Sequence, residues 1–582
     1  MKHLPCICAV AISLAVTAMD AVAQNAASTD LVGLWQAKRG FDTGAAGRLV
    51  VDRAGGGWRA AIAGRTAAVR VAGDTVAFAL PDSSGRFVGR FDAGRSRITG
   101  HWVQPRTVTS GNWYASPLAL ASCGANCFAG TVIPAADELT FFIRVERRPD
   151  GRLAALLRNP ERNLGGQFIR LARIEADGPG VRLLDRRDSV LFRGELRDGV
   201  MTVYIPGRGG SYDFQPVRGD AFTFFYPRGR PTASYTYVPP RQRDDGWPVG
   251  TLDQAGISRE RISAALDSLI DTPVDSIGAH KLHSLVIARH GRIVLEEYFY
   301  GADADIPHET RSASKTVTTV MAGAAMQAGA RVGPATPVYA TLRPGAAGLD
   351  ARKRALTLEH LLNMASGYDC DDSGDRPGDE DVITQQADNP DWASVILALN
   401  LVREPGDSAV YCSINPHLAG VVLSRATGRW LPDLWHDLVA QPLGIDRYYI
   451  PLTPTEDAYM GGGWLLRIRD FMKLGQVYLN GGTWQGRRIV SEDWVRRSTE
   501  PRYPMGTRAR YGYLWWMMDY PYAGRTIRAY FASGNGGQYV MVIPELDLVI
   551  GANGGNYNDR AGFQTVVDLI PRVILPAVAA GR

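Results

Sequence analysis

The sequence predicts two domains, an all-β domain over residues 30–240 and a domain of mixed helices and strands over residues 248–582. Between 30 and 240, short runs alternate apolar and polar residues and are separated by glycine-rich turns, which is typical of antiparallel strands. Further on, Lys315–Met326 is mostly apolar, lacks proline and carries no charge after the lysine, which indicates a buried helix. The polar segment 241–247 between the two regions is interpreted as a linker.

Residues 1–23 predict a secretory signal peptide. Lys2 precedes an apolar stretch from Leu4 to Met19, and Ala21-Val22-Ala23 forms a small-residue cleavage site. No cysteine stands at that site to carry a lipid anchor, and no later stretch is long and apolar enough to span a bilayer. We therefore expect an exported protein, either periplasmic or secreted.

The predicted β domain shows a trace of internal duplication. Val51-Asp52-Arg53 followed by Gly57 matches Val145-Glu146-Arg147 followed by Gly151, position for position. Two similar halves would close into one barrel or sandwich. The alternative is that any two hairpins with a glycine turn look alike. The domain holds no cluster of nucleophile, base and orienting group, so we expect it to bind, shield or position something.

The motif Ser312-Ala313-Ser314-Lys315 is the only place in the chain where a lysine follows a serine by three positions. If Ser312 opens the predicted helix, Lys315 lies one turn further on the same face, where its amine can reach the hydroxyl. A neutral lysine could then take the serine proton during attack on a carbonyl, beside the positive end of the helix. The alternative is an ordinary N-cap serine with an exposed lysine.

Other segments after Gly246 come in the order of a known family. They are a strand pair at 284–298, a helix and turn at 356–367, a tyrosine loop at 405–413, a glycine-rich block at 461–464 and a final segment at 533–538 before a predicted strand at 539–544. Together with the Ser-x-x-Lys motif, this stretch resembles the class C β-lactamase-like serine hydrolases of the serine β-lactamase and penicillin-binding superfamily. The resemblance implies an α/β fold of the β-lactamase/transpeptidase type, an antiparallel sheet flanked by helices.

The resemblance also implies roles for individual residues. Ser312 would be the nucleophile, Lys315 its base and Tyr411 a proton relay. The backbone N–H groups of Ser312 and Gln538 would form the oxyanion hole. The residues implied in substrate binding are Ser413, Asn535, Gly536 and Gly537.

The tyrosine loop departs from the usual Tyr-x-Asn of the family, because this chain has Tyr411-Cys412-Ser413. That variant resembles the subgroup that includes 6-aminohexanoate-dimer hydrolases and some carboxylesterases. A second register remains open, since Ser413-Ile414-Asn415 would fit the Ser-x-Asn of class A enzymes. The preceding Pro405-Gly406 and its spacing favour Tyr411.

A second departure lies at Asn535-Gly536-Gly537, where the family commonly has Lys-Thr-Gly or His-Thr-Gly. A cation that would hold a substrate carboxylate is missing there. This favours an esterase, amidase or D-amino-acid peptidase over an efficient β-lactamase. A non-turnover protein that acylates like a penicillin-binding receptor is the alternative from another class.

Four cysteines remain after the predicted cleavage site. Cys123 and Cys127 share a short loop, and Cys370 and Cys412 flank the proposed active site. In an oxidising compartment, two disulfides are expected, Cys123–Cys127 and Cys370–Cys412, of which the second would hold the tyrosine loop in place.

Composition and motifs argue against other function classes. The chain has no G-x-S-x-G or H-E-x-x-H motif, and its nine histidines are scattered, so neither a metal nor an organic cofactor is expected. The net charge of +5 is small for 582 residues and the arginines are dispersed, which gives little case for nucleic acid. We expect a small-molecule or peptide-like ester or amide as substrate; the sequence does not define the oligomeric state.

Overall fold

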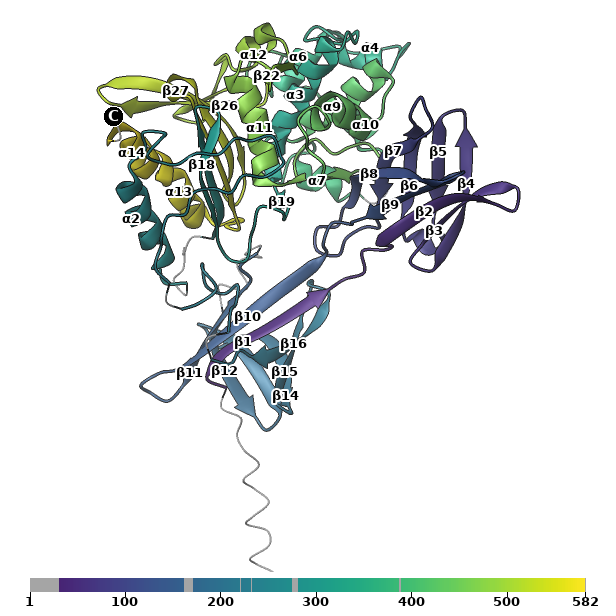
Figure 1. Ribbon diagram of the computed structural model, residues 1–582. Coiled ribbons are helices and arrows are strands. Elements are labelled where there is room, and N and C mark those ends of the chain that lie inside the picture. The colour runs from purple at the N-terminus through teal and green to yellow at the C-terminus, as the bar shows by residue number, and fades with distance from the viewer. Residues whose placement is uncertain are drawn as a thin grey trace, which may run out of the picture.

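The computed structural model describes residues 31–580, apart from 162–170, 220, 232, 275–280 and 387–388. The predicted signal peptide lies outside these residues and stays a prediction. The described chain forms two β barrels and an α/β domain (Figure 1).

The first barrel is a meander in which each strand pairs with the next. It closes because β9 pairs with both β2 and β8. Its strands are β2 (Gly47–Ala54), β3 (Gly57–Ile62), β4 (Arg65–Ala72), β5 (Thr75–Ala79), β6 (Arg86–Phe91), β7 (Arg97–Val103), β8 (Trp113–Gly124) and β9 (Cys127–Val132), with the short η1 (Pro81–Ser83) after β5.

The second barrel surrounds the first in the sequence. Its first strand precedes the first barrel and pairs with both β10 and β16, which closes the ring. Its strands are β1 (Gly33–Gly40), β10 (Glu138–Arg147), β11 (Leu153–Arg158), β12 (Leu171–Asp177), β13 (Gly180–Asp185), β14 (Val190–Arg197), β15 (Val200–Ile205) and β16 (Gly210–Pro216).

The prediction of a single barrel or sandwich therefore needs correction, because each half closes on itself. The two matched segments occupy comparable places. Val51 lies in β2 and Val145 in β10, each strand continues into a hairpin, and each valine is buried in its own barrel. The halves do not merge because each has its own closing strand, which leaves no open edge to pair with the other half. The duplication itself stays a prediction.

The α/β domain is built on an antiparallel eight-stranded sheet, which confirms the α/β character predicted for the C-terminal region. In spatial order its strands are β18 (Arg292–Tyr298), β17 (Leu282–Arg289), β29 (Leu548–Gly554), β28 (Gln538–Ile543), β27 (Arg525–Gly534), β26 (Trp515–Tyr522), β25 (Ala509–Gly512) and β24 (Tyr503–Met505).

Helices cover both faces of this sheet, so its central strands are buried on both sides. Along β28, Tyr539, Met541 and Ile543 pack into one apolar cluster, whereas Val540 and Val542 pack into the other. One face carries α2 (Arg259–Ile270), α13 (Arg560–Leu569), η5 (Ile570–Ile574) and α14 (Leu575–Ala580). The other face carries α11 (Ile468–Leu479) and the helices that surround α3 (Lys315–Gln327).

The remaining elements are short or belong to the helical region. They are η2 (Arg311–Ser314), α4 (Val338–Leu342), α5 (Ala351–Ala355), α6 (Leu358–Leu362), α7 (Glu380–Thr384), α8 (Trp392–Ala398), α9 (Ile414–Thr427), α10 (Leu431–Trp435), η3 (His436–Ala440), β22 (Thr483–Trp484), β23 (Arg487–Arg488), α12 (Glu492–Ser498) and η4 (Pro544–Leu546).

The first barrel and the α/β domain share a sheet. Strand β20 (Tyr448–Leu452) pairs with β8 of the barrel, and β21 (Leu465–Leu466) and β19 (His308–Glu309) continue the same sheet. A buried histidine reinforces this junction, because the two ring nitrogens of His101 lie 3.0 Å from the carboxylate of Asp433 and 3.0 Å from the hydroxyl of Tyr448.

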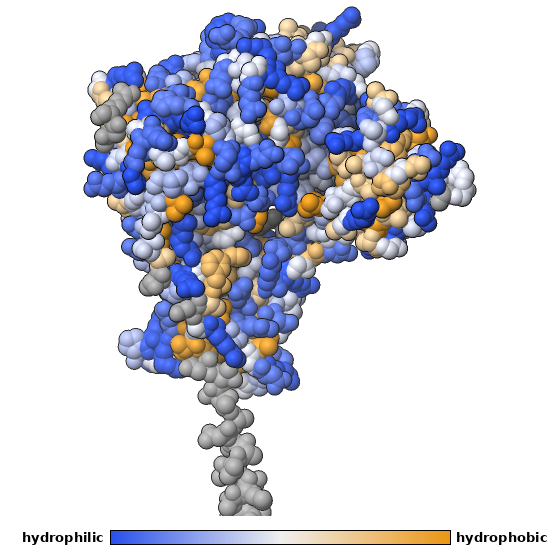
Figure 2. Space-filling model, viewed as in Figure 1, coloured by the Kyte–Doolittle hydropathy of each residue, from blue (hydrophilic) through white to orange (hydrophobic). Residues whose placement is uncertain are grey.

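The segment interpreted as a linker is anchored at its end. The Trp247 side chain is buried, its Nε1 donates to the carbonyl of Arg469 at 2.9 Å, and its ring lies edge-on to Trp484. Within the part of the chain that the structure describes, no helix is long and apolar enough to cross a membrane. On the face shown in Figure 2, hydrophilic residues predominate over the α/β domain and the hydrophobic ones form small scattered groups.

Candidate active site

Ser312 and Lys315 meet at the junction of η2 and α3. Lys315 Nζ donates to Ser312 Oγ at 2.8 Å and also to the carbonyl of Gly461. Only 1% of Lys315 is exposed, so it is not the exposed first-turn lysine of the alternative interpretation. The α-helix begins at the lysine rather than at the serine. The preceding 3₁₀ turn places residues three apart on one face, which brings the two side chains together.

The turn that carries Ser312 is held from both sides. Thr310 donates its N–H and its hydroxyl to the carbonyl of Trp464, and Gly463 donates its N–H to the carbonyl of Arg311. Arg311 has a φ of +47°, in the left-handed region that most residues avoid. Strain of this kind persists only where the surroundings fix the backbone.

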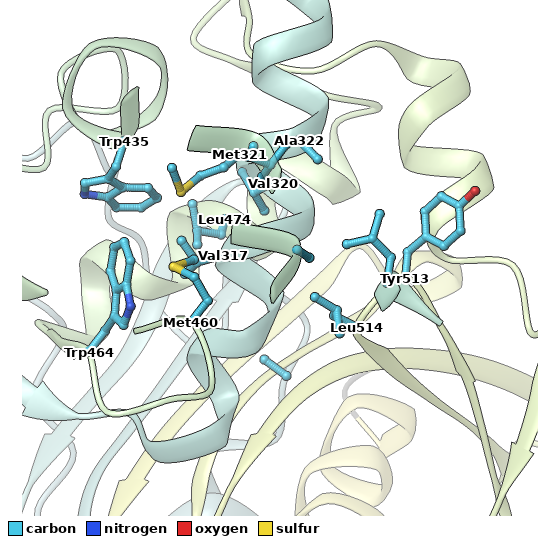
Figure 3. Packing of buried hydrophobic residues seen from close by; sticks show 14 of the residues in the cluster. Val317, Val320, Met321, Ala322, Trp435, Met460, Trp464, Leu474, Tyr513 and Leu514 are labelled. Carbon is cyan, nitrogen blue, oxygen red and sulfur yellow. The ribbon is translucent and has the colours of Figure 1, made fainter. Parts of the chain in front are cut away.

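Helix α3 is anchored beneath the turn by close packing. Figure 3 shows Val317 and Met321 of α3 beside Trp435 and Trp464. The two indole rings are 5.2 Å apart and nearly perpendicular, a favoured aromatic arrangement. Ser312 is therefore positioned by a rigid element.

The end of β27 lies directly against the same turn, and glycine makes this approach possible. A Cβ added at Gly534 would lie 2.4 Å from the carbonyl oxygen of Thr310 and 2.9 Å from the backbone nitrogen of Ala313. The approach brings the start of β28, and with it the buried Gln538, next to the Ser312 turn. Gln538 is further fixed by its side-chain amide, which exchanges hydrogen bonds with the backbone of Gly554.

Tyr411 lies beside the lysine. Lys315 Nζ is 5.1 Å from the centroid of the Tyr411 ring, and that ring packs on Trp516 at 5.4 Å. The structure thus brings together Ser312, Lys315 and Tyr411, the three residues predicted to be catalytic.

Ser413, the alternative to Tyr411, is engaged elsewhere. Its hydroxyl lies 2.7 Å from Asp372 Oδ2 and 3.1 Å from Glu380 Oε2, and its backbone N–H also donates to Asp372. Glu380 accepts a further hydrogen bond from the hydroxyl of Tyr459 at 2.5 Å. In the alternative Ser-x-Asn register, the serine therefore contacts two carboxylates rather than the lysine.

These carboxylates raise the pKa of Lys315. Burial alone would lower the pKa of Lys315, but Tyr411, Glu380 and Asp372 outweigh it and raise the pKa above its ordinary value. For a carboxyl group burial acts in the other direction: it raises the pKa of Asp372, against the opposing effect of Lys315. These groups accordingly favour the protonated form of the lysine in the free protein.

Both predicted disulfides are confirmed. Cys123–Cys127 closes the hairpin between β8 and β9, and Cys370–Cys412 joins the segment before α7 to the tyrosine loop. The second disulfide explains why Asp372 meets Ser413, since each follows one of its cysteines closely in sequence.

The predicted substrate-binding loop lies between β27 and β28. Asn535 is exposed and pairs with Asn558 in both directions, donating to Oδ1 at 2.7 Å and accepting from the backbone N–H at 3.0 Å. Gly536 and Gly537 have φ values of +96° and +101°, which favour glycine.

A cavity of about 780 Å³ opens over the nucleophile. Ser312, Gly461, Gly462, Gly463 and Asn535 line it from the α/β domain, together with Glu380 and Asp381 of α7. A further wall comes from the first barrel, through the loop that leads from β7 to the start of β8. In Figure 1, β8 lies next to α7.

Sequence reasoning missed two parts of this site. One is the carboxylate pair of Asp372 and Glu380. The predicted Cys370–Cys412 disulfide could have revealed it, because it ties the acidic run 371–381 to the tyrosine loop. The other is the barrel loop, for which the sequence offers no signal.

One acidic group could at first sight hold a metal ion, namely Asp371, Asp375 and Asp379. Asp379 already accepts hydrogen bonds from five backbone N–H groups, and these outweigh burial to lower its pKa to about 2. Arg376 pairs with Asp371. The group is thus satisfied by the protein itself and does not fit a metal ion.

Comparison with known protein families covers the region that contains this site. Residues 266–558, slightly more than half of the chain, match the family model described as Beta-lactamase. A 6-aminohexanoate-dimer hydrolase from Paenarthrobacter ureafaciens is 26% identical over 219 residues, which cover 36% of this chain and 55% of that protein. The chain thus spans about half the length of this relative.

Two solved structures show weaker likeness. A family VIII carboxylesterase is 20% identical, with a TM-score of 0.42 over 55% of this chain and 97% of that one. A penicillin-binding protein homolog from Caulobacter crescentus is 16% identical, with a TM-score of 0.42 over 53% of this chain and 97% of that one.

Proposed function

Because this chain belongs to the Beta-lactamase family, we propose that it is a serine hydrolase that cleaves an ester or amide through an acyl-enzyme on Ser312. The observation that carries the proposal is the 2.8 Å hydrogen bond from Lys315 Nζ to Ser312 Oγ, at a nucleophile that faces a cavity of about 780 Å³. The relative that hydrolyses 6-aminohexanoate dimers supports a linear amide or ester as substrate.

In the proposed acylation, Ser312 Oγ attacks the substrate carbonyl and its proton passes to the Lys315–Tyr411 pair. The backbone N–H groups of Ser312 and Gln538 would stabilise the oxyanion. The bond to the alcohol or amine then breaks, and Tyr411 returns the proton to the leaving group. Water then attacks the resulting ester of Ser312 and gives a proton to the Lys315–Tyr411 pair. The acid product leaves as the proton returns to Ser312 Oγ.

The raised pKa of Lys315 sets a condition on this mechanism. A protonated lysine cannot accept the serine proton, so only the fraction with a neutral amine is active as a base. That fraction grows about tenfold per pH unit below the pKa, and we therefore expect the rate to rise toward alkaline pH.

A fluorophosphonate probe tests the proposal. Peptide mapping should place the adduct on Ser312, and Ser312→Ala should abolish both labelling and ester hydrolysis. Ser314→Ala is the matched control, since its hydroxyl donates to the carbonyl of Arg311 rather than to the lysine. An adduct on any other serine overturns the assignment. If an ester instead acylates Ser312 and the acyl-enzyme is not hydrolysed, the non-turnover, receptor-like alternative is indicated.

We also propose that the protein is exported. Two disulfides support an oxidising compartment, and the signal-like residues 1–23 support secretion. N-terminal sequencing of protein recovered from the cell envelope or the medium should give Gln24 as the first residue.

A further inference from the structure

We propose that Arg106, supplied by the first barrel, is a specificity residue that binds a carboxylate on the substrate of Ser312. The inference rests on the proposed function and deepens it, because it assigns a charge to the substrate. It also gives the first barrel a role, which the sequence left open.

The barrel loop belongs to the same cavity as the nucleophile. Arg106, Ser110, Asn112 and Trp113 line the cavity that contains Ser312. Strand β8 begins at Trp113, and Trp113 pairs with Leu452 of β20, which lines the same cavity. The continuous sheet therefore fixes the loop relative to the α/β domain.

The loop is also ordered internally. The carboxylate of Asp137 accepts hydrogen bonds from the backbone N–H groups of Val108 and Thr109, at 2.5 and 2.9 Å. The hydroxyls of Thr107 and Ser110 lie 2.6 Å apart. A loop fixed by such contacts holds its side chains in place before a ligand arrives, which lowers the entropic cost of binding.

Arg106 presents a charge that its surroundings leave available. Its Nε donates to the carbonyl of Gly111 at 2.5 Å, and its guanidinium lies 5.4 Å from the centroid of the Trp113 ring. These two contacts orient the side chain without neutralising it. Among the described residues no carboxylate forms an ion pair with Arg106. The other arginine of the cavity, Arg311, differs because Glu309 lies 3.1 Å from its Nε.

A planar guanidinium is suited to a carboxylate, which it can bind through two parallel hydrogen bonds. The family's usual cation for this purpose is replaced by Asn535, whose amide is already paired with Asn558. Arg106 would supply the missing charge from a different domain, at a different place in the cavity. Substrates with a carboxylate should accordingly bind better than neutral isosteres.

Two matched pairs of esters test the proposal. The first pair carries the charge on the acyl side: mono-p-nitrophenyl glutarate and its methyl ester. The second carries it on the leaving group: 4-carboxyphenyl butyrate and 4-(methoxycarbonyl)phenyl butyrate. In one of the pairs, Arg106→Gln should raise the KM of the charged member about five- to tenfold, with kcat and the neutral member unchanged. The effect should shrink as salt is added, because Arg106 is exposed.

Three further variants serve as controls for the charge effect. Arg106→Lys keeps the charge and should retain part of the preference. Arg70→Gln removes an exposed charge from β4, which is not among the strands lining the cavity, and should change nothing. Asp381→Asn removes an opposing charge from the cavity and should strengthen the preference. Equal effects of Arg106→Gln on both members of both pairs would overturn the proposal.

The role of Arg106 can be tested even if the proposed hydrolase function is wrong. If the wild-type protein hydrolyses none of the four esters, binding is measured instead by titrating glutarate and its dimethyl ester into Ser312→Ala protein. Glutarate should bind more tightly than the diester, and the additional change Arg106→Gln should remove that difference. No difference between the two ligands would reject the role of Arg106 regardless of the catalytic mechanism.

Discussion

Asp372 accepts two hydrogen bonds from Ser413, one from its hydroxyl at 2.7 Å and one from its backbone N–H. These residues are 41 positions apart in sequence, and the Cys370–Cys412 disulfide lies next to both. The contact places a carboxylate at the N-terminus of α9, where a negative charge is favourable. It also places that carboxylate close enough to Lys315 to raise the pKa of the lysine.

The first prediction separates Tyr411 from Ser413. Tyr411→Phe keeps the ring that packs on Trp516 and removes only the hydroxyl, so the fold should survive while the rate falls by about 10²-fold or more. Ser413→Ala should have a smaller effect, because that hydroxyl contacts carboxylates rather than the lysine. Steady-state kinetics with a p-nitrophenyl ester would decide; if Ser413→Ala proves much more damaging, the Ser-x-Asn register is correct.

The second prediction concerns pH. Glu380 favours the protonated form of Lys315 and so raises its pKa. Glu380→Gln removes that charge and should lower the pKa, which makes the neutral amine available at lower pH. The rising limb of kcat/KM against pH should therefore move toward lower pH.

Asp381→Asn is the matched control for this experiment, measured on a neutral ester. Asp381 lines the same cavity but is not among the groups with the largest effects on the pKa of Lys315. An unchanged limb in Glu380→Gln, or an equal shift in both variants, would show that Glu380 does not act on the base.

The third prediction compares the two disulfides. Cys370–Cys412 spans a sequence separation of 42 and Cys123–Cys127 a separation of 4. In the chain-entropy account, loss of the longer link costs about 4 kcal/mol and loss of the shorter about 2 kcal/mol. Thermal unfolding of the two double Cys→Ser variants should show the larger loss for Cys370/Cys412, accompanied by lower activity because the tyrosine loop is released. Equal stability losses, with activity kept, would contradict this role.

The features that the sequence predicted well involve residues that are close in sequence, or cysteines, which pair with one another. Ser312 and Lys315 are three residues apart, so a single turn brings their side chains together, even though that turn proved to be 3₁₀ rather than α-helical. The disulfides followed from four cysteines in two neighbourhoods. The burial of Lys315–Ala325 followed from the absence of charge after the lysine.

The features that it did not predict depend on partners distant in sequence. Strand β1 pairs with β10, although the whole first barrel lies between them in the sequence, and no local pattern reveals such a pairing. The contact of Glu380 with Ser413 depends on the path of a loop. Arg106 reaches the cavity only because β8 pairs with β20.

The last prediction separates an esterase from a β-lactamase. The amide of Asn535 offers neutral hydrogen bonds worth about 1 kcal/mol, against about 1.5–3 kcal/mol for a charged partner, and both ends of that amide already pair with Asn558. An ester is also easier to cleave, since its alkoxide leaves without the full protonation that an amine requires. Short-chain p-nitrophenyl esters should thus be hydrolysed faster than nitrocefin, and Asn535→Lys should shift the ratio toward nitrocefin.

Asn558→Ala is the control for this shift, because it frees Asn535 from its partner without adding a charge. If Asn558→Ala shifts the ratio as much as Asn535→Lys does, release of the loop rather than the new cation is responsible. Efficient nitrocefin hydrolysis by the unmodified protein, with esters ignored, would reject the esterase interpretation. In that case an arginine must hold the β-lactam carboxylate. Arg106 and Arg311 line the cavity that contains Ser312, so they would be the residues to substitute next.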